Sequence, residues 1–111
     1  MPHADLKYSS DLDFDAQEVL RAIETTINAH DAGAGVCKGR AYPAAVFHHT
    51  HLLVEVSLLT KPHRDAAFTR ALRDDLEAAV KTHLRQRCYF SMAIHYSDDF
   101  YLTNVFEPSA G

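Results

Sequence analysis

The chain has 111 residues, of which 47% are hydrophobic, and this length predicts one domain with a core of its own. Lys plus Arg number 11 and Asp plus Glu number 15, so the formal net charge is −4, which argues against a nucleic-acid partner. No apolar run reaches the roughly 18 residues needed to cross a bilayer, and the first residues do not resemble a secretory signal. We therefore expect a cytoplasmic protein without a membrane partner. Cys37 and Cys88 are too few for a disulfide framework, and we expect reduced thiols.

The first half of the chain predicts a strand, a helix and a second strand. Apolar and polar residues alternate over His3–Tyr8, which is typical of a strand. A capping-box spacing, followed by apolar residues every three or four positions, predicts a helix over Ala16–His30. The glycines in residues 32–35 end that helix. A less regular second strand is expected over Lys38–His49.

The second half of the chain repeats this order. A dense Leu and Val run predicts a strand over His51–Leu59 that is buried on both faces. An apolar stripe opposite a charged face predicts a helix over Arg64–Arg87. A strand rich in aromatic residues follows over Tyr89–Tyr96, and Phe100–Phe106 is expected to form a short edge strand.

The two halves together predict an α/β fold. Two pseudo-symmetric β-α-β units would form one four-stranded mixed sheet with both helices on one face. The strand that begins at Pro2 should run parallel to the strand that begins near His51, or closely neighbour it. A single helix layer leaves the other sheet face uncovered, so we expect a partner subunit there. Leu53 and residues Val54 to Leu59 should then lie near the interface, with Val56 buried in it.

The first candidate for chemistry is Pro2. Methionine before a small residue is ordinarily removed, which would leave Pro2 with a secondary amine that can act as a base. The strand that follows at once would hold this nitrogen at a fixed point. An apolar pocket or nearby cations would lower the pKa of the amine into a useful range. If Met1 is retained, the Pro2 nitrogen is an amide and cannot act as a base.

Four short motifs, spread from the chain start to the second helix, carry a resemblance to a known family. They are Pro2-His3, Tyr8-Ser9, Gly39-Arg40 and Val80-Lys81-Thr82-His83-Leu84. Together they resemble 5-carboxymethyl-2-hydroxymuconate isomerases of the tautomerase superfamily, and the likeness extends loosely over the whole chain. The resemblance implies one tautomerase-like domain over residues 1–111, a homotrimer, and an isomerase of aromatic catabolism. Its substrate would be an unsaturated dicarboxylate or 2-hydroxydienoate.

The resemblance also implies the site residues. Pro2 would be the catalytic base, and Arg40 would bind a substrate carboxylate or stabilise the dienolate. Lys38, two residues earlier, would be a second substrate-binding residue. A guanidinium offers a planar fork of donors to a carboxylate or to developing negative charge. Proton transfer of this kind needs a placed base and charge stabilisation, so no cofactor and no metal are expected.

Three departures from the family pattern favour an alternative function. Lys7 stands where the family commonly has an acidic residue, and Tyr101 stands where it commonly has a lysine. The segment between Arg40 and His51 also looks shorter than in similar proteins. The alternative is a non-catalytic homotrimer that keeps the fold as a small-molecule binding or assembly module. Lys7 would either lower the pKa of the Pro2 amine or point into solvent.

The histidines provide a third and weaker hypothesis. His48, His49 and His51 could bind zinc or copper, but no Cys or carboxylate accompanies them at a motif spacing, so a polar turn is the preferred interpretation. His3 is expected to face away from Pro2 and to make a hydrogen bond within the sheet. The aromatic residues of the last third are expected in the core, at a subunit interface or around the Pro2 pocket.

Overall fold

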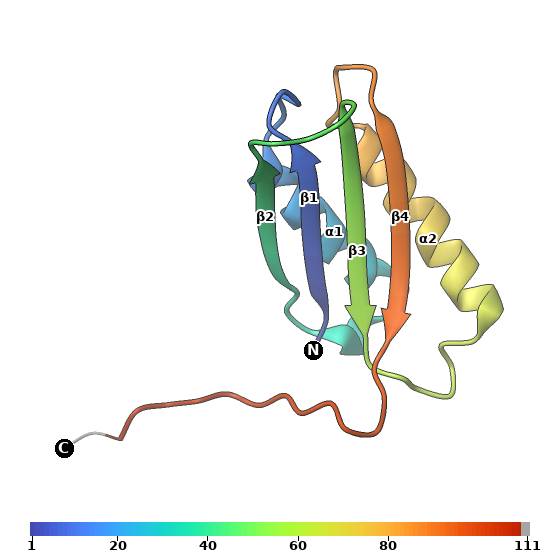
Figure 1. Cartoon of the computed structure of the whole chain (residues 1–111). Coiled ribbons are helices and arrows are strands. Elements are labelled where there is room, and N and C mark those ends of the chain that lie inside the picture. The colour runs from blue at the N-terminus through green and yellow to red at the C-terminus, as the bar shows by residue number, and fades with distance from the viewer. Residues whose placement is uncertain (110–111) are drawn as a thin grey trace.

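A computed structural model, which describes residues 1–109, shows a four-stranded sheet with two helices behind it (Figure 1). The elements are β1 (His3–Ser9), α1 (Ala16–His30), the 3₁₀ turn η1 (Ala32–Ala34), β2 (Lys38–Ala44), β3 (His51–Leu58), α2 (Ala66–Lys81) and β4 (Tyr89–Tyr96). None of the helices within residues 1–109 has both the length and the hydrophobicity that crossing a membrane demands.

The sheet has the order β2-β1-β3-β4 and is mixed, as predicted. β1 pairs in parallel with β2, and β3 pairs in parallel with β4, so each β-α-β unit forms one half of the sheet. β1 and β3 are neighbours, which confirms one form of the prediction, but they are antiparallel, so the parallel form is wrong. The two β-α-β units are related by an approximate two-fold axis perpendicular to the sheet, and this relation explains the antiparallel pairing of β1 and β3. It reverses the strand direction of the second unit and keeps both helices on one face (Figure 1).

The first helix has the predicted bounds, and the second is shorter than predicted. The carboxylate of Asp65 accepts a hydrogen bond from the backbone N–H of Phe68 at 2.9 Å, and this cap starts α2 at Ala66. At the other end, the N–H of Leu84 bonds to the carbonyl of Lys81 at 3.1 Å, an i to i−3 turn that closes the helix. Leu84 lies beyond the end of α2, but its side chain still packs against the core.

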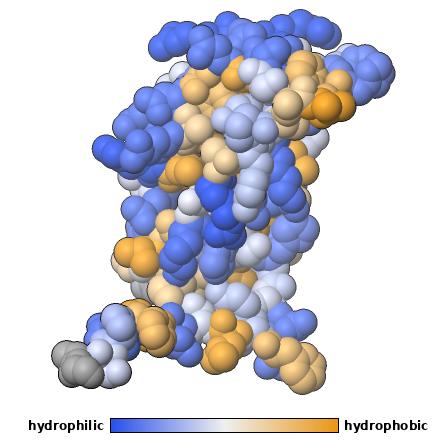
Figure 2. Space-filling view, turned by 60° about the vertical axis from the view of Figure 1, so that its left-hand side comes forward, coloured by the Kyte–Doolittle hydropathy of each residue, from blue (hydrophilic) through white to orange (hydrophobic). Residues whose placement is uncertain are grey.

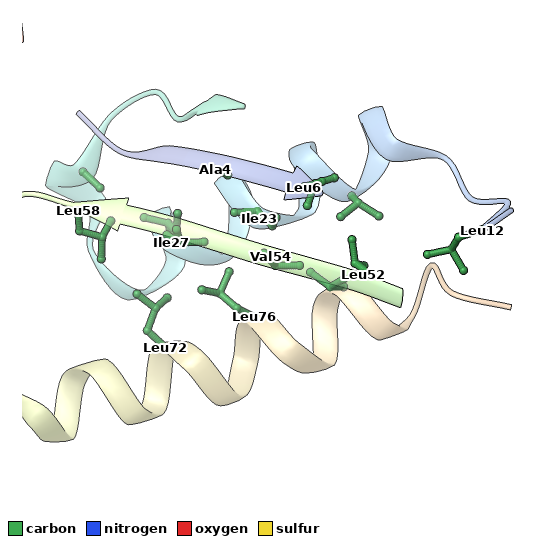
Figure 3. Close-up of a cluster of buried hydrophobic side chains, with 14 residues drawn as sticks. Ala4, Leu6, Leu12, Ile23, Ile27, Leu52, Val54, Leu58, Leu72 and Leu76 are labelled. Carbon is green, nitrogen blue, oxygen red and sulfur yellow. The ribbon is translucent and has the colours of Figure 1, made fainter. Parts of the chain in front are cut away.

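The core lies between the sheet and the two helices (Figure 3). β3 contributes one fully buried row, and α1 and α2 cover it with residues such as Ile23 and Leu76. The buried row is Leu52, Val54, Val56 and Leu58. The alternate residues of β3, including Leu53 and Glu55, are only half-buried on the opposite face. The prediction that this strand is buried on both faces, with Val56 at an interface, is therefore wrong, because Val56 faces the helices.

Two predicted strand segments do not pair. β2 stops at Ala44, not at His49, because β1, the strand with which it pairs, ends at the partner residue Ser9. Residues Phe100–Phe106 form no strand, since no neighbouring strand within residues 1–109 offers them hydrogen bonds. This C-terminal segment instead leaves β4 and runs past the start of β1 (Figure 1).

Candidate active site

Pro2 lies buried at the entry to β1. Its carbonyl accepts a hydrogen bond from the backbone N–H of Lys38 at 3.0 Å, which extends the β1–β2 ladder by one bond. The chain start is therefore held by the sheet up to Pro2. A nitrogen at this position has a fixed place, which is the first requirement for a general base.

Two cavities flank this position, and Met1 lines both. The first, of about 290 Å³, lies at the end of the sheet and is lined by Met1, His3, Arg40, Ser57, Leu58, His95, Tyr96, Ser97 and Tyr101. The second, also about 290 Å³, is lined by Met1, Pro2, Gly33, Ala34, Leu59, Lys61, Arg64 and Thr103. Because Met1 is shared, the bond between Met1 and Pro2 lies between the two spaces.

The surroundings of the chain start are electropositive. Burial lowers the pKa of the Met1 amine, and the charges of Lys38, Lys61 and Arg64 lower it further. The Lys38 ammonium is itself inaccessible to solvent, and no group within residues 1–109 hydrogen-bonds to it. A buried ammonium without a partner is costly, so this position favours an anion beside it.

Arg64 is the most deeply buried of these cations and is tied to Asp31. Its side chain is 3% exposed, and its Nε and Nη2 donate to Oδ2 of Asp31 at 3.1 and 2.9 Å. Its Nη1 donates to the carbonyl of Leu59 at 2.8 Å. The hydrogen bond from His63 and then the Arg64 guanidinium lower the pKa of Asp31 to about 2. This cluster joins the end of α1 to the loop after β3, which forms one wall of the second cavity.

A hydrogen-bonded chain crosses the first cavity. Arg40 Nε lies 2.5 Å from Asp5 Oδ1, and Arg40 Nη2 lies 3.2 Å from His3 Nδ1. The other ring nitrogen of His3 lies 3.1 Å from the Tyr101 hydroxyl, which donates to the Met1 carbonyl at 3.3 Å. Burial lowers the pKa of His3, and the positive charges of Arg40 and Lys38 lower it further. His3 is therefore held neutral at pH 7.

The structure brings the predicted site residues to one end of the sheet. Lys38 is the register partner of His3, and Arg40 is the partner of Asp5, so these side chains share the sheet face away from the helices. The expected hydrogen bond of His3 within the sheet is confirmed by its contact with Arg40. Lys7 forms an ion pair with Glu55 at 2.9 Å on the same face and is half-exposed.

Two residues at the site, Lys61 and Arg64, have no role predicted from the sequence, and Tyr101 is singled out there only as a departure from the family pattern. Lys61 and Arg64 lie in the loop before α2, and the predicted helix includes Arg64 because it directly precedes the helix cap. Tyr101 reaches His3 across 98 positions of sequence, and no local pattern signals such a contact. The sequence offers one signal for Lys61 and Arg64, which is that two basic residues lie close together at a predicted helix start.

The histidine-rich segment forms the connection from β2 to β3, as the polar-turn interpretation predicted. His49 has a φ of 65°, a conformation typical of turns, and its carbonyl lies 2.9 Å from the ring nitrogen Nδ1 of His51. Within residues 1–109, no three His, Cys, Asp or Glu side chains are grouped so that they could hold a metal ion.

No model of a known protein family matches the chain, and no curated protein matches it. Solved structures do. A 5-carboxymethyl-2-hydroxymuconate delta-isomerase is 19% identical with a TM-score of 0.73, and the match covers 96% of this chain and 89% of that one. A 5-carboxymethyl-2-hydroxymuconate isomerase from Deinococcus radiodurans R1 is 20% identical, also with a TM-score of 0.73, over 94% and 90% of the two chains. The chain has the tautomerase fold.

A more distant match extends this result to other tautomerase-fold proteins. A macrophage migration inhibitory factor-like protein from Entamoeba histolytica is 9% identical, with a TM-score of 0.60 over 86% and 88% of the chains. The resemblance indicated by the sequence motifs is thus confirmed at the level of the fold.

Proposed function

We propose that the chain, once Met1 is removed, is a tautomerase-type isomerase that uses the Pro2 amine as its base. The observation that carries this proposal is the position of Pro2, which is buried, hydrogen-bonded to Lys38 of β2 and part of the lining of the second cavity, while Met1 before it lines both cavities. The burial and the cations that lower the pKa of the Met1 amine would act in the same sense on a Pro2 amine. A lower pKa raises the fraction of the secondary amine that is neutral near pH 7 and can accept a proton.

The substrate class follows from the charges around Pro2. Arg40 lines the first cavity, where it is ion-paired with Asp5 and uses one of its five N–H donors in the hydrogen bond to His3. Its remaining donors can bind a carboxylate or a dienolate oxygen. The buried Lys38 ammonium can bind a second carboxylate. This arrangement suits an unsaturated dicarboxylate or a 2-hydroxydienoate.

The reaction is a proton transfer through one base. The neutral Pro2 nitrogen takes a proton from the enol hydroxyl or from an acidic carbon, which leaves a conjugated dienolate and a Pro2 ammonium. The ammonium then returns the proton to another carbon of the conjugated system, so the base is regenerated. Arg40 stabilises the negative charge that exists between the two steps.

The active form is proposed to be a homotrimer. In the C-terminal segment, Phe100, Leu102, Val105 and Phe106 are 75–92% exposed, an unusual exposure for large apolar side chains. Figure 2 shows hydrophobic residues along this projecting segment. A fused 4-OT with the same fold, 17% identical with a TM-score of 0.58 over 86% and 84% of the chains, is described as a symmetric trimer. Neighbouring copies in a homotrimer would remove these side chains from water, which would stabilise the assembly.

Ketonisation of 2-hydroxymuconate, followed by absorbance, tests the function on a chain whose intact mass shows the loss of Met1. We expect a faster reaction than in buffer, slowed by Pro2→Ala, which replaces the secondary amine with a weaker primary one. Arg40→Ala should cost about 2 to 4 kcal/mol of transition-state stabilisation. Arg70→Ala, on the exposed face of α2, is the matched control and should change nothing.

Two results would overturn the proposal. If the chain without Met1 does not accelerate the reaction, the non-catalytic binding or assembly module becomes the better account. If activity survives both Pro2→Ala and Arg40→Ala, or depends on added zinc, the site lies elsewhere.

A further inference from the structure

Tyr101 differs from its neighbours in the C-terminal segment. Phe100 and Leu102 are 92% and 81% exposed, whereas Tyr101 is 38% exposed and lines the first cavity. Its ring meets the His3 ring edge-on, with 6.3 Å between centroids. The backbone N–H of Phe100 bonds to the Asp98 carboxylate at 2.9 Å, and this turn directs the segment so that Tyr101 faces the site.

The hydrogen bonds that end at Tyr101 have one consistent direction. An arginine side chain can only donate, so Arg40 Nη2 donates to Nδ1 of His3. The neutral imidazole then carries its hydrogen on the other nitrogen and donates it to the Tyr101 oxygen. The Tyr101 hydrogen is consequently free to point onward, and it is donated to the Met1 carbonyl. Each donor polarises the next, which strengthens the last bond of the chain.

The acceptor at the end of this chain is the oxygen nearest to the Pro2 nitrogen in the bond from Met1. An amide oxygen lies about 2.3 Å from its amide nitrogen. Removal of Met1 takes this oxygen away and frees the Pro2 amine at the same time. The Tyr101 hydroxyl then points at the space that the Met1 carbonyl oxygen occupied beside the Pro2 amine. A substrate that gives its proton to Pro2 must place an oxygen or a carbon atom in that space.

We propose that Tyr101 is a catalytic residue that donates a hydrogen bond to the enolate oxygen of the substrate, in the place that the Met1 carbonyl oxygen occupies in the unprocessed chain. This proposal rests on the function proposed above. Arg40 and Tyr101 act together: the guanidinium binds the carboxylate and its positive charge favours the dienolate, and the neutral phenol donates a hydrogen bond to the oxygen on which the charge develops. His3 is a positioning residue that acts through Tyr101.

The test compares Tyr101→Phe with the wild-type chain, both without Met1, in the 2-hydroxymuconate assay. Loss of one donor to a developing oxyanion is expected to lower kcat about a hundredfold with a small change in KM. Tyr89→Phe, which removes a hydroxyl from an exposed tyrosine on β4, is the matched control and should behave as wild type. A Tyr101→Phe chain as fast as an active wild type overturns the role of Tyr101 and leaves the proposed function standing.

A binding measurement separates the two proposals when no isomerisation is seen. Salicylate carries a hydroxyl oxygen next to a carboxylate on a planar conjugated frame, so it imitates the 2-hydroxydienoate. We expect wild type without Met1 to bind salicylate and Tyr101→Phe to bind it at least tenfold more weakly. Equal binding by both chains overturns the role of Tyr101, and no binding by wild type overturns both proposals.

The role of His3 is tested by non-additivity. His3→Leu should lower kcat and leave KM within about twofold, and the double variant with Tyr101→Phe should be no slower than Tyr101→Phe alone. If His3 were only structural, the two losses would add, and that result would contradict its action through Tyr101.

Discussion

Arg64 and Tyr101 each contact a partner that lies far away in the sequence. Pro2, Lys38 and Arg40 are predicted instead from short motifs and a family resemblance, and the structure gathers them at one end of the sheet. Tyr101 could not be found in this way, because its partner His3 is 98 positions away. The burial of Arg64 was equally invisible, since its partner Asp31 belongs to the end of the other helix.

The contacts of Asp31 with His63 and with Arg64 make stability depend on pH in a defined direction. The folded-state pKa of Asp31, about 2, lies below its ordinary value of 3.8. A lowered carboxyl pKa contributes stability above about pH 4, and this contribution is lost as pH falls toward 2. Asp31→Asn, which keeps an oxygen to accept the N–H of Gly33, should therefore lower the unfolding free energy by about 2 kcal/mol at pH 7.

Urea denaturation at pH 7 and at pH 2.5 measures this difference, which should shrink at the lower pH. Asp99→Asn, at an exposed position after β4, is the control and should leave stability unchanged at both pH values. A loss for Asp31→Asn that is the same at both pH values would show that the charge of Asp31 is not its cause.

At the scale of elements, strand and helix positions were predictable and their ends less so. Apolar periodicity located α1 and β4 within a residue, because one face of each packs on the core. The ends of β2 and α2 are set by strand pairing and by helix capping. β2 stops where β1 no longer pairs with it, and α2 starts at the Asp65 cap. A partner's length cannot be read from the strand itself.

The packing of β2 against α1 requires a glycine at position 39. A Cβ there would lie 2.8 Å from Cδ2 of Leu20 and 3.3 Å from its Cβ. Gly39→Ala should lower the unfolding free energy by about 1 to 3 kcal/mol, since the Leu20 side chain must change its conformation to admit the methyl group. Thermal and urea unfolding measure this loss.

The Leu20→Ala variant is used to measure the energetic coupling between positions 20 and 39. Its combination with Gly39→Ala should lose less stability than the sum of the two single changes. Gly33→Ala, where the nearest atom would lie 3.5 Å from the new Cβ, is the control for the loss of a glycine. Fully additive losses would mean that the contact between positions 39 and 20 is not the reason for the glycine.

At the scale of the whole molecule, two surfaces are candidates for assembly. The outer sheet face, where the sequence predicts a partner subunit, carries ion pairs such as Lys7–Glu55. The C-terminal segment carries several exposed large apolar side chains close together in sequence, whereas others, such as Val36 and Val46, are exposed elsewhere. Its residues Phe100–Phe106 were predicted as a strand, and a neighbouring copy is the place where such a segment could gain a partner.

Sedimentation distinguishes assembly from folding. The wild-type chain at micromolar concentration should sediment with three times its 12.4 kDa mass. Phe106→Asp should give folded monomers, because Phe106 is 85% exposed, whereas Val56→Asp should unfold the chain by burying an unpaired charge. A wild-type mass of 12.4 kDa would contradict the homotrimer, and a trimer unaffected by Phe106→Asp would exclude this residue from the interface.

The account depends most on Pro2 being a free amine with a lowered pKa. A chain labelled with ¹⁵N-proline allows the Pro2 nitrogen to be titrated directly by NMR. We predict a titration midpoint below the value near 8 that is usual for an α-amine, since burial and the charges of Lys38, Lys61 and Arg64 disfavour its protonated form. A nitrogen that does not titrate, because Met1 is still attached, or a midpoint at or above the usual value, would contradict the account.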